Sequence, residues 1–294
     1  MLDRKLVFMA GLPRSGSTLL GALLAQNPRI HTEPASPLME LVAAINQILE
    51  RNEHYRAYPK QKQLFALIRS LFPSYYGNTD RPVIVDKNRG WPIQISGLEQ
   101  CVVEKAKIIC PVRSIDEILA SLLRIARENP WDPQSGRINF IDRHLIAANQ
   151  SINDDNRCEA LLDIRGLLGQ SMAAIHSAID KGFGDRLHFV EYAKLVKSPA
   201  KTLAGIYRFI GEEPYQGHVF DSIAQGEREN DSEVFAVPSL HEVRPKLEKS
   251  STDPAAVLPA RYYERCQGAE FWRAGGVARN SSLIDKGRTI THNT

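Results

Sequence analysis

LVFMAGLPRSGSTLL, residues Leu6–Leu20, is the stretch that decides the fold. Its first five residues are apolar and uninterrupted, which is typical of a strand buried on both faces of a parallel sheet. A glycine-containing turn, residues 11–16, follows at once, and the apolar residues after Ser17 and Thr18 favour a helix. A helix that begins directly after such a turn presents unpaired N–H groups to an anion. The stretch therefore predicts a strand, a phosphate-binding loop and a helix, in that order.

The loop resembles a Walker A motif in its two glycines, but Ser17 stands where that motif carries its lysine. In nucleoside triphosphate enzymes this lysine and a Mg²⁺ ion neutralise the β and γ phosphates. Arg14 is the only cation inside the loop here. Its guanidinium, together with backbone N–H groups and the hydroxyls of Ser15, Ser17 and Thr18, suits a less charged end group, such as a sulfate on a phosphate. A glycine-rich turn without function is the alternative interpretation.

Outward from this stretch, apolar segments alternate with helical patterns along the chain. Further strands are predicted at residues 83–86, 107–110 and 187–190, and residues 30–32 form a short extended piece before Glu33. The apolar spacing predicts helices over residues 16–26, 37–48, 61–72, 93–103, 115–125, 158–179 and 199–210. Ser114 and Glu117 have the spacing of a capping box at the start of one of these helices. The alternation predicts an α/β fold, a three-layer α/β/α sandwich around a central, mostly parallel sheet with a P-loop.

The chain of 294 residues is long enough for one large α/β domain, which we place at residues 1–273. Residues 274–294 are polar with scattered glycine and predict an irregular C-terminal tail. Residues 129–155 are polar and poor in helical signal at first, so we expect an insertion or lid on the substrate side there.

Charge and composition narrow the class of protein. A net charge of +3 and a pI near 8.6 are too weakly basic for a nucleic-acid surface, but they fit a few cations gathered around a polyanionic small molecule. The four cysteines have no C-x-x-C spacing, which favours a reduced, cytoplasmic protein. No segment reaches the roughly 20 apolar residues of a membrane-spanning helix, and Pro13 and Arg14 interrupt the apolar start too early for a secretion signal. We therefore expect a soluble protein.

Two motifs carry a resemblance to a known family. Residues 13–18 read PRSGST, and the 5′-phosphosulfate loop of sulfotransferases that use 3′-phosphoadenosine 5′-phosphosulfate (PAPS) reads P-[RK]-S-G-[ST]-T. The second motif of that family binds the donor's 3′-phosphate with an arginine just after a strand and a serine eight positions later, and Arg113 and Ser121 have this spacing. Taken singly, Arg113 would be an ordinary strand-end cation and Ser121 an ordinary helix serine. Together the motifs resemble the tyrosylprotein and related bacterial sulfotransferases over roughly residues 5–250.

This resemblance implies roles for individual residues. Glu33 lies where the family has its catalytic base, and Lys87, in the segment VDKN, lies where a lysine assists the leaving group. Without that context, Glu33 would be a solvated loop acid and Lys87 a surface lysine. His31 is a second possible base, although a histidine at a strand end is more often structural. The residues implied to hold the donor are Pro13, Arg14, Ser15, Gly16, Ser17, Thr18, Arg113, Ser121, Tyr192 and Ser239.

The expected reaction is transfer of a sulfuryl group from PAPS to a hydroxyl or amine acceptor, which leaves 3′-phosphoadenosine 5′-phosphate (PAP) and requires no metal. The acceptor stays open among small molecules, sugars, lipids and peptides, and Trp91, Trp131 and residues 129–140 are candidates to line its pocket. No nucleic-acid partner and no membrane span are expected. Two alternatives remain, a P-loop kinase with an atypical loop and a non-catalytic nucleotide-binding protein.

Overall fold

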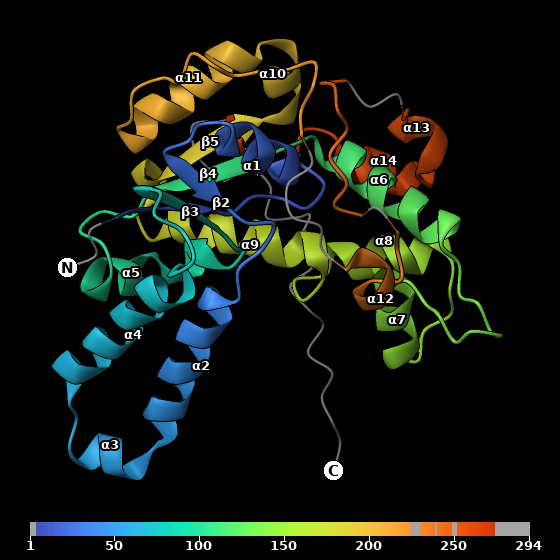
Figure 1. Ribbon diagram of the computed structural model, residues 1–294. Helices are drawn as coiled ribbons and strands as arrows, with labels where there is room; N and C mark the ends of the chain where they lie inside the picture. The colour runs from blue at the N-terminus through green and yellow to red at the C-terminus, as the bar shows by residue number, and fades with distance from the viewer. Residues whose placement is uncertain (1–3, 225–229, 239, 249–251, 274–294) are drawn as a thin grey trace.

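A sheet of five parallel strands lies at the centre of the computed structural model, which describes residues 4–224, 230–238, 240–248 and 252–273 (Figure 1). The strands are β1 (Lys5–Met9), β2 (Ile30–Thr32), β3 (Val83–Lys87), β4 (Ile108–Val112) and β5 (Leu187–Glu191). Their order across the sheet is β2-β3-β1-β4-β5, so β1 is the central strand. The predicted tail, residues 274–294, lies outside the described residues.

The strand that the sequence did not predict is β2, at one edge of the sheet. Its three residues pair in parallel with β3, Ile30 opposite Val83 and Thr32 opposite Val85. We expected only an extended piece there, because three residues are too few for an apolar pattern to be read as a strand. The other four strands begin and end within two residues of the predicted bounds.

Helices cover both faces of the sheet, which confirms the three-layer α/β/α prediction. Successive side chains of β1 point to opposite faces: Val7 and Met9 enter one apolar core, and Leu6 and Phe8 enter the other. The first core is closed by α1 (Ser17–Ala25), α10 (Tyr192–Lys197) and α11 (Pro199–Ile210). The second is closed chiefly by α4 (Gln61–Tyr75), α5 (Ile95–Cys101), α6 (Ile115–Glu128) and α9 (Leu167–Asp180) (Figure 1).

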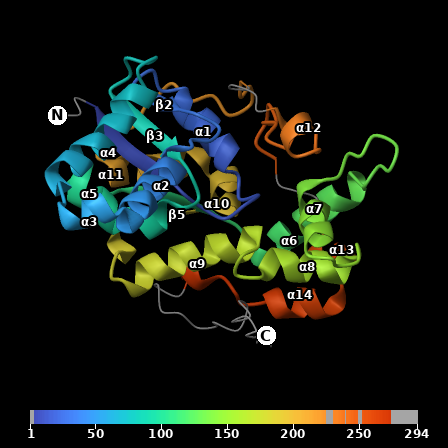
Figure 2. The ribbon, with the colours of Figure 1, turned by 90° about the horizontal axis from the view of Figure 1, so that it is seen from below.

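The remaining helices extend the molecule beyond these layers. An arm is formed by α2 (Leu38–Arg51) and α3 (Glu53–Ala57), which lead back into α4 (Figure 1). At the other end of α9 lies a second group, shown together in Figure 2. This group consists of α7 (Phe140–Ala147), α8 (Asp154–Leu162), α12 (Asp231–Val234), α13 (Pro254–Val257) and α14 (Ala260–Cys266). Three short 3₁₀ turns complete the elements: η1 (Trp91–Gln94), η2 (Gly184–Arg186) and η3 (Phe271–Arg273). None of the helices in the described part of the chain combines the length and the apolar character of a membrane-spanning helix.

The single helix predicted over residues 158–179 is wrong, because the chain turns between α8 and α9. A Cβ atom on Gly166, at the start of α9, would lie 1.9 Å from the carbonyl oxygen of Ala160 in α8. Only glycine allows the two backbones to approach this closely. The apolar pattern of the two helices is continuous enough to hide the break, and Gly166 was the local signal for it.

The prediction of a capping box at the start of α6 is also wrong, because the expected hydrogen bonds are not made. Ser114 is the N-cap residue, but its side chain makes no capping hydrogen bond. The carboxylate of Glu117 instead accepts a hydrogen bond of 2.7 Å from Nε of Arg113. The helix therefore begins where expected, while Glu117 holds the arginine that precedes it.

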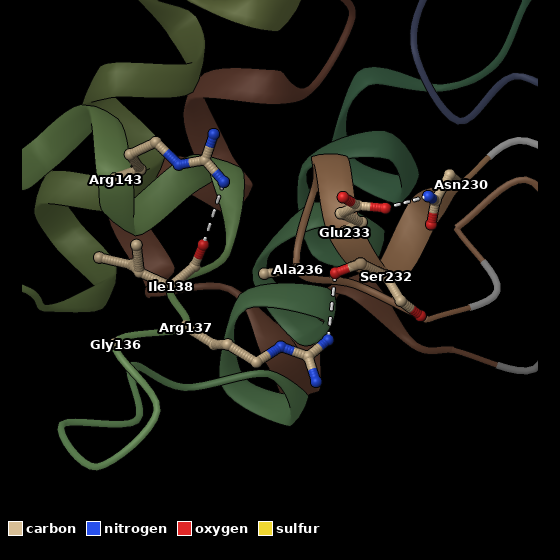
Figure 3. Close-up of a pocket in the computed structure, with 8 residues that line it drawn as sticks. All are labelled: Gly136, Arg137, Ile138, Arg143, Asn230, Ser232, Glu233 and Ala236. Carbon is tan, nitrogen blue, oxygen red and sulfur yellow. Dashed lines mark hydrogen bonds between the residues drawn. The ribbon is translucent and has the colours of Figure 1, made fainter.

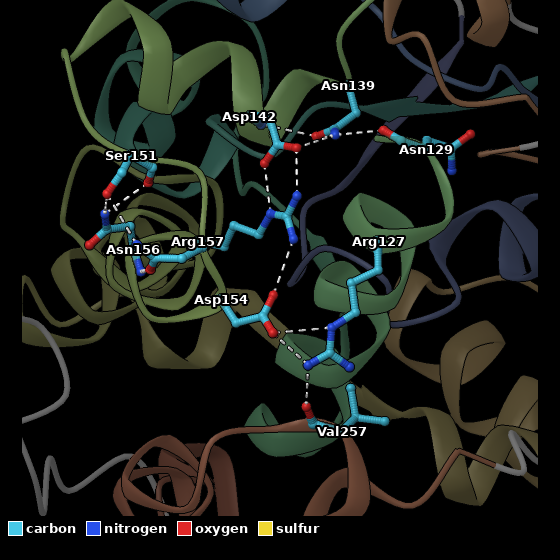
Figure 4. A network of polar contacts seen from close by, with 10 residues as sticks. Arg127, Asn129, Asn139, Asp142, Ser151, Asp154, Asn156, Arg157 and Val257 are labelled. Atoms are coloured by element: carbon cyan, nitrogen blue, oxygen red, sulfur yellow. Dashed lines mark hydrogen bonds and ion pairs between the residues drawn. The ribbon is translucent and has the colours of Figure 1, made fainter. Parts of the chain in front are cut away.

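A buried ion pair joins α7 to α8 (Figure 4). Arg157 donates two hydrogen bonds of 2.7 Å, from Nε and Nη2, to the two carboxylate oxygens of the fully buried Asp142. Its Nη1 atom reaches Asp154, which also binds Arg127 of α6. Asn139 caps α7 and donates to Asp142. The network thus fixes the start of α7 against α6 and α8.

We expect the substitution Asp142→Ala to lower the free energy of unfolding by about 3 kcal/mol, because it leaves the buried guanidinium of Arg157 without its main partner. Urea unfolding monitored by circular dichroism measures the change. The control is Arg165→Gln, which removes the exposed ion pair with Asp163 and should change stability by less than about 0.5 kcal/mol. Equal effects of the two substitutions would contradict the structural role of the buried pair.

Candidate active site

The strand order brings the candidate functional loops to one edge of the sheet. All five strands are parallel, so their carboxyl ends lie on the same side, and the chain reverses its winding direction between β1 and β4. The phosphate-binding loop follows β1, and Arg113 follows β4, the adjacent strand. Lys87 ends β3, the neighbour of β1 on the other side. A cavity of about 850 Å³ opens along this edge.

Most of the predicted site residues line this cavity. They are Pro13, Arg14, Gly16, Ser17, Thr18, Lys87, Arg113, Ser121 and Tyr192. Ser15 and Glu33 are described by the structure but are not among the residues that line the cavity. Ser239 lies outside the described residues, between two residues that do belong to them.

The loop takes its shape from two residues with left-handed backbone conformations. Gly16 has φ +85°, and Arg14 has φ +56°. A Cβ atom at Gly16 would lie 2.7 Å from Cδ2 of Tyr192, so glycine is required both for the conformation and for the approach of the tyrosine ring. The ring of Tyr192 also lies 4.9 Å from the guanidinium carbon of Arg113, within the range of a cation–π contact. Tyr192 therefore lies between the two phosphate-binding motifs.

Ser15 holds the loop in place from inside the protein. Its hydroxyl is buried and lies within hydrogen-bonding distance of two carbonyl oxygens, 2.5 Å from that of Leu12 and 2.9 Å from that of Pro111 at the end of β4. The backbone N–H of Leu12 also donates to the carbonyl of Pro111, at 2.9 Å. The predicted contact between the Ser15 hydroxyl and the donor does not fit this arrangement, in which the hydroxyl is engaged by the backbone.

Five arginines line the cavity, and four of them, Arg14, Arg113, Arg124 and Arg244, interact electrostatically with one another around Arg14. Burial lowers the pKa of Arg14, and the positive charges of Arg113, Arg124 and Arg244 lower it further. Nε of Arg14 donates to Oγ of Ser121 at 3.4 Å, and its Nη1 donates to the carbonyl of Leu240 at 2.5 Å. More arginines and lysines than carboxylates line the cavity, so it holds an excess of positive charge. An anion in the cavity would be strongly favoured.

Sequence reasoning missed Arg124 and Arg244. Arg124 follows Ser121 by three positions on α6, so both lie on the same side of that helix, and this spacing was an available signal. Its buried Nε atom has no hydrogen-bond partner and lies 3.6 Å from a carboxylate oxygen of Glu128. Arg244 lies in a segment without regular structure, where the sequence carried no local signal for it.

Lys87 is positioned by the strand end and by the loop. Its Nζ atom donates to Oγ1 of Thr18 at 3.2 Å, which joins the end of β3 to the first turn of α1. The preceding residue, Asp86, is fully buried and accepts hydrogen bonds from the Tyr76 hydroxyl at 2.9 Å and from Trp91 Nε1 at 2.7 Å. Burial raises the pKa of Asp86, while these hydrogen bonds act in the opposite direction. The two bonds anchor the strand end that carries Lys87.

The carboxylate of Glu33 lies beside His31, with Oε1 3.1 Å from Nε2 of the imidazole. Both side chains are largely buried, and the His31 ring packs edge-on against Tyr76. The neighbouring residues 34–37 line the cavity. A different carboxylate, that of Glu40 in the first turn of α2, lines the cavity and accepts a hydrogen bond of 2.7 Å from Asn88.

Of the residues predicted to line an acceptor pocket, only Phe140 lines this cavity. Trp91 is fully buried in the core beneath the sheet, with its indole N–H bound to Asp86. Trp131 is 50% exposed and does not line the cavity. Phe140, at the end of the predicted segment, does line it.

A second, more open cavity of about 640 Å³ lies between residues 136–143 and 230–236 (Figure 3). Arg137 donates to the carbonyl of Ser232 at 3.1 Å, and Arg143 donates to that of Ile138 at 3.4 Å. The first bond joins the segment before α7 to α12, and the second joins that segment to α7 itself. None of the predicted site residues lines this cavity, so the carboxyl edge of the sheet is the candidate active site.

Metal binding and cysteine chemistry have little support among the described residues. No group of three or more histidine, cysteine, aspartate or glutamate side chains is arranged there to hold a metal ion. Cys101, Cys110, Cys158 and Cys266 are free thiols, all buried. Burial raises the pKa of the Cys158 and Cys266 thiols to about 12, which keeps them protonated and unreactive at neutral pH.

We compared the chain with known proteins and solved structures. A search of curated proteins gave no match. Among solved structures, a sulfotransferase domain from the curacin biosynthetic pathway has a TM-score of 0.52 and 17% identity, covering 89% of this chain and 95% of its own. A sulfotransferase from Alicyclobacillus acidocaldarius has a TM-score of 0.47 and 12% identity, covering 78% and 87%. A mouse sulfotransferase solved in complex with PAP has a TM-score of 0.49 and 15% identity, covering 93% and 88%.

At these identities, the likeness to the curacin-pathway domain concerns the fold alone. The family model described as the sulfotransferase family matches residues 7–216, more than half of the sequence. The matched segment contains the loop after β1, Lys87, Arg113, Ser121 and Tyr192. The chain therefore belongs to the sulfotransferase family.

Proposed function

We propose that this protein transfers the sulfuryl group of PAPS to a hydroxyl or amine acceptor. The observation that carries the proposal is the convergence of the PRSGST loop with Arg113, Ser121 and Lys87 around one cationic cavity. A donor with phosphate groups at both its 5′ and 3′ positions needs two anion sites, and the two motifs supply them from adjacent strand ends. Family membership supports sulfuryl transfer in general.

In this proposal, the loop and the first turn of α1 bind the 5′-phosphosulfate. Arg14, the hydroxyls of Ser17 and Thr18 and the N-terminal end of the helix contribute hydrogen bonds and positive potential. Arg113 and Ser121 bind the 3′-phosphate, which selects PAPS over ATP. Tyr192, packed between the two motifs, is a donor contact.

During transfer, the acceptor oxygen or nitrogen attacks sulfur in line with the departing phosphate oxygen. The new bond to sulfur forms as the bond between sulfur and the phosphate oxygen breaks, and the acceptor proton passes to a carboxylate base. Lys87 and Arg14 stabilise the negative charge that develops on the leaving phosphate. We propose Glu33 as the base, at the end of β2 and next to the lining residue Pro34, and these steps need no metal ion.

The decisive experiment offers labelled PAPS with pools of acceptors and follows label transfer. We expect transfer from PAPS that EDTA leaves unchanged, and no phosphoryl transfer from ATP with Mg²⁺. Turnover of ATP without PAPS would instead identify an atypical P-loop kinase. Thermal stabilisation by PAP without transfer to any acceptor would identify a non-catalytic nucleotide-binding protein.

We expect Arg113→Ala to weaken PAP binding by roughly 10- to 150-fold, because a charge-assisted hydrogen bond to phosphate contributes ~1.5 to 3 kcal/mol. Isothermal titration calorimetry measures this affinity. The matched control is Arg208→Ala, which removes an exposed arginine of α11 outside the cavity. An unchanged affinity in Arg113→Ala would overturn the assignment of the 3′-phosphate site.

The base is tested by comparing two isosteric substitutions, Glu33→Gln and Glu40→Gln. If Glu33 accepts the acceptor proton, Glu33→Gln should lower kcat by roughly 10²- to 10⁴-fold while PAP affinity stays unchanged. Glu40→Gln should then retain most of the activity. The reverse pattern would transfer the role to Glu40, the carboxylate that lines the cavity.

A further inference from the structure

The cavity continues past the donor-binding residues along one side of α9. Four residues of this helix line it, namely Leu167, Gln170, Ser171 and Ala174. Their spacing of three, one and three positions places them on a single helix face. The same side of the cavity is bounded by residues from η1, which packs against α9, and from α2.

Six apolar residues line this part, although the charged Glu40 and Arg89 also line the cavity, next in sequence to Met39 and Gly90. Ile93 of η1 is 50% exposed, and Met39 of α2 packs so closely on Gly90 that a Cβ there would lie 2.0 Å from the methionine methyl group. At the other end, Phe140 and Phe235 meet edge to face with ring centroids 6.1 Å apart, and both line the cavity. We call the six residues Met39, Ile93, Phe140, Leu167, Ala174 and Phe235 the apolar subsite.

The polar groups of the α9 face are few and uncharged. The hydroxyl of Ser171 donates a hydrogen bond of 2.8 Å to the carbonyl of Leu167 in the same helix, so it does not donate to a ligand. The amide of Gln170 is the remaining polar side chain of this face. The donor half of the same cavity, in contrast, contains the arginine cluster around Arg14. The α9 face therefore presents no charge to a ligand, in contrast to the arginine cluster.

We propose that the apolar subsite binds the acceptor, and that the acceptor is an uncharged, mainly apolar alcohol. This inference rests on the proposed function, because the subsite is continuous with the loop and with Lys87 in one cavity. An apolar acceptor gains free energy by leaving water for these walls, whereas a sugar or an acidic peptide would lose hydrogen bonds to water without replacing them. The hydroxyl of the alcohol then faces the sulfuryl group.

A chain-length series of primary alcohols from ethanol to octanol tests the proposal, with PAPS as the donor. We expect kcat/KM to rise about fourfold for each added methylene group, as burial of a methylene predicts. Octanol should be a far better acceptor than glucose or an acidic tyrosine-containing peptide. No dependence on chain length, or a preference for glucose or the peptide, would overturn the proposal.

Substitutions locate the effect in the apolar subsite. Ile93→Asp places a charge beside the acceptor at a half-exposed position, where the fold should tolerate it, and should lower kcat/KM for octanol roughly tenfold or more. Ile93→Val should keep most of the activity. Ala174→Phe fills the groove and should shorten the longest alcohol accepted, whereas Ala173→Phe, which alters a neighbouring position outside the cavity lining, should not.

The outcomes separate this proposal from the proposed function. PAP affinity, measured by calorimetry, should be the same in the wild type, Ile93→Asp and Ala174→Phe, since the substituted residues lie in the acceptor half. If the wild type binds no PAP and transfers no label to any acceptor, the proposed function fails. If it binds PAP and sulfates acceptors, but Ile93→Asp retains full activity toward octanol, only the apolar subsite is refuted.

Discussion

The carbonyl oxygen of Pro111 holds the site together. It accepts a hydrogen bond from the backbone N–H of Leu12 and lies within hydrogen-bonding distance of the buried hydroxyl of Ser15. Through these contacts the end of β4 fixes the turn after β1. The left-handed conformations of Arg14 and Gly16 carry a backbone cost that a free loop would avoid. The anchored loop can keep them because its position is fixed by the adjacent strand.

This anchoring also explains how the protein tolerates a cluster of arginines. Burial and neighbouring cations disfavour the charged form of Arg14, so the arginine cluster is electrostatically unfavourable by itself. Part of the cost is offset by the carboxylate of Glu117, by the ring of Tyr192 and by the carbonyl of Leu240. The remaining excess of positive charge leaves repulsion between the arginines. A polyanion that binds there would relieve this repulsion, and the free energy released would add to its affinity. The arginine cluster thus lowers the stability of the folded protein and, at the same place, raises its affinity for an anion.

The local features of the fold could be predicted from the sequence, and the direction of individual side chains could not. The strand, the loop and the helix at Leu6–Leu20 follow from residues adjacent in the chain, so the pattern sufficed. The hydroxyl of Ser15 was expected to face the donor, but it lies against two carbonyl oxygens, one of which, that of Pro111, is almost one hundred residues away. Glu33 was expected at the strand end, where it lies, yet its nearest partner is His31 rather than the cavity.

The difference between local pattern and distant contact also explains which residues the sequence analysis missed or misassigned. Arg124 lies in an ordinary amphipathic helix, and only its position one turn beyond Ser121 marked it. Trp91 was a candidate for the acceptor pocket, but the buried Asp86 binds its indole N–H and directs the ring into the core. The turn between α8 and α9 depends on the close approach of Gly166 to Ala160, a contact that an apolar pattern does not encode. Each of these features is decided by packing between elements.

The contact between Arg14 and Leu240 couples the start of the chain to its C-terminal part. The guanidinium donates to a carbonyl 226 positions later, and Tyr192 donates in the same way to the carbonyl of Glu248. A guanidinium has five N–H donors, so the bond to Leu240 leaves Arg14 further donors for an anion. One side chain can therefore join the C-terminal part of the chain to the loop and contact a ligand in the cavity at the same time.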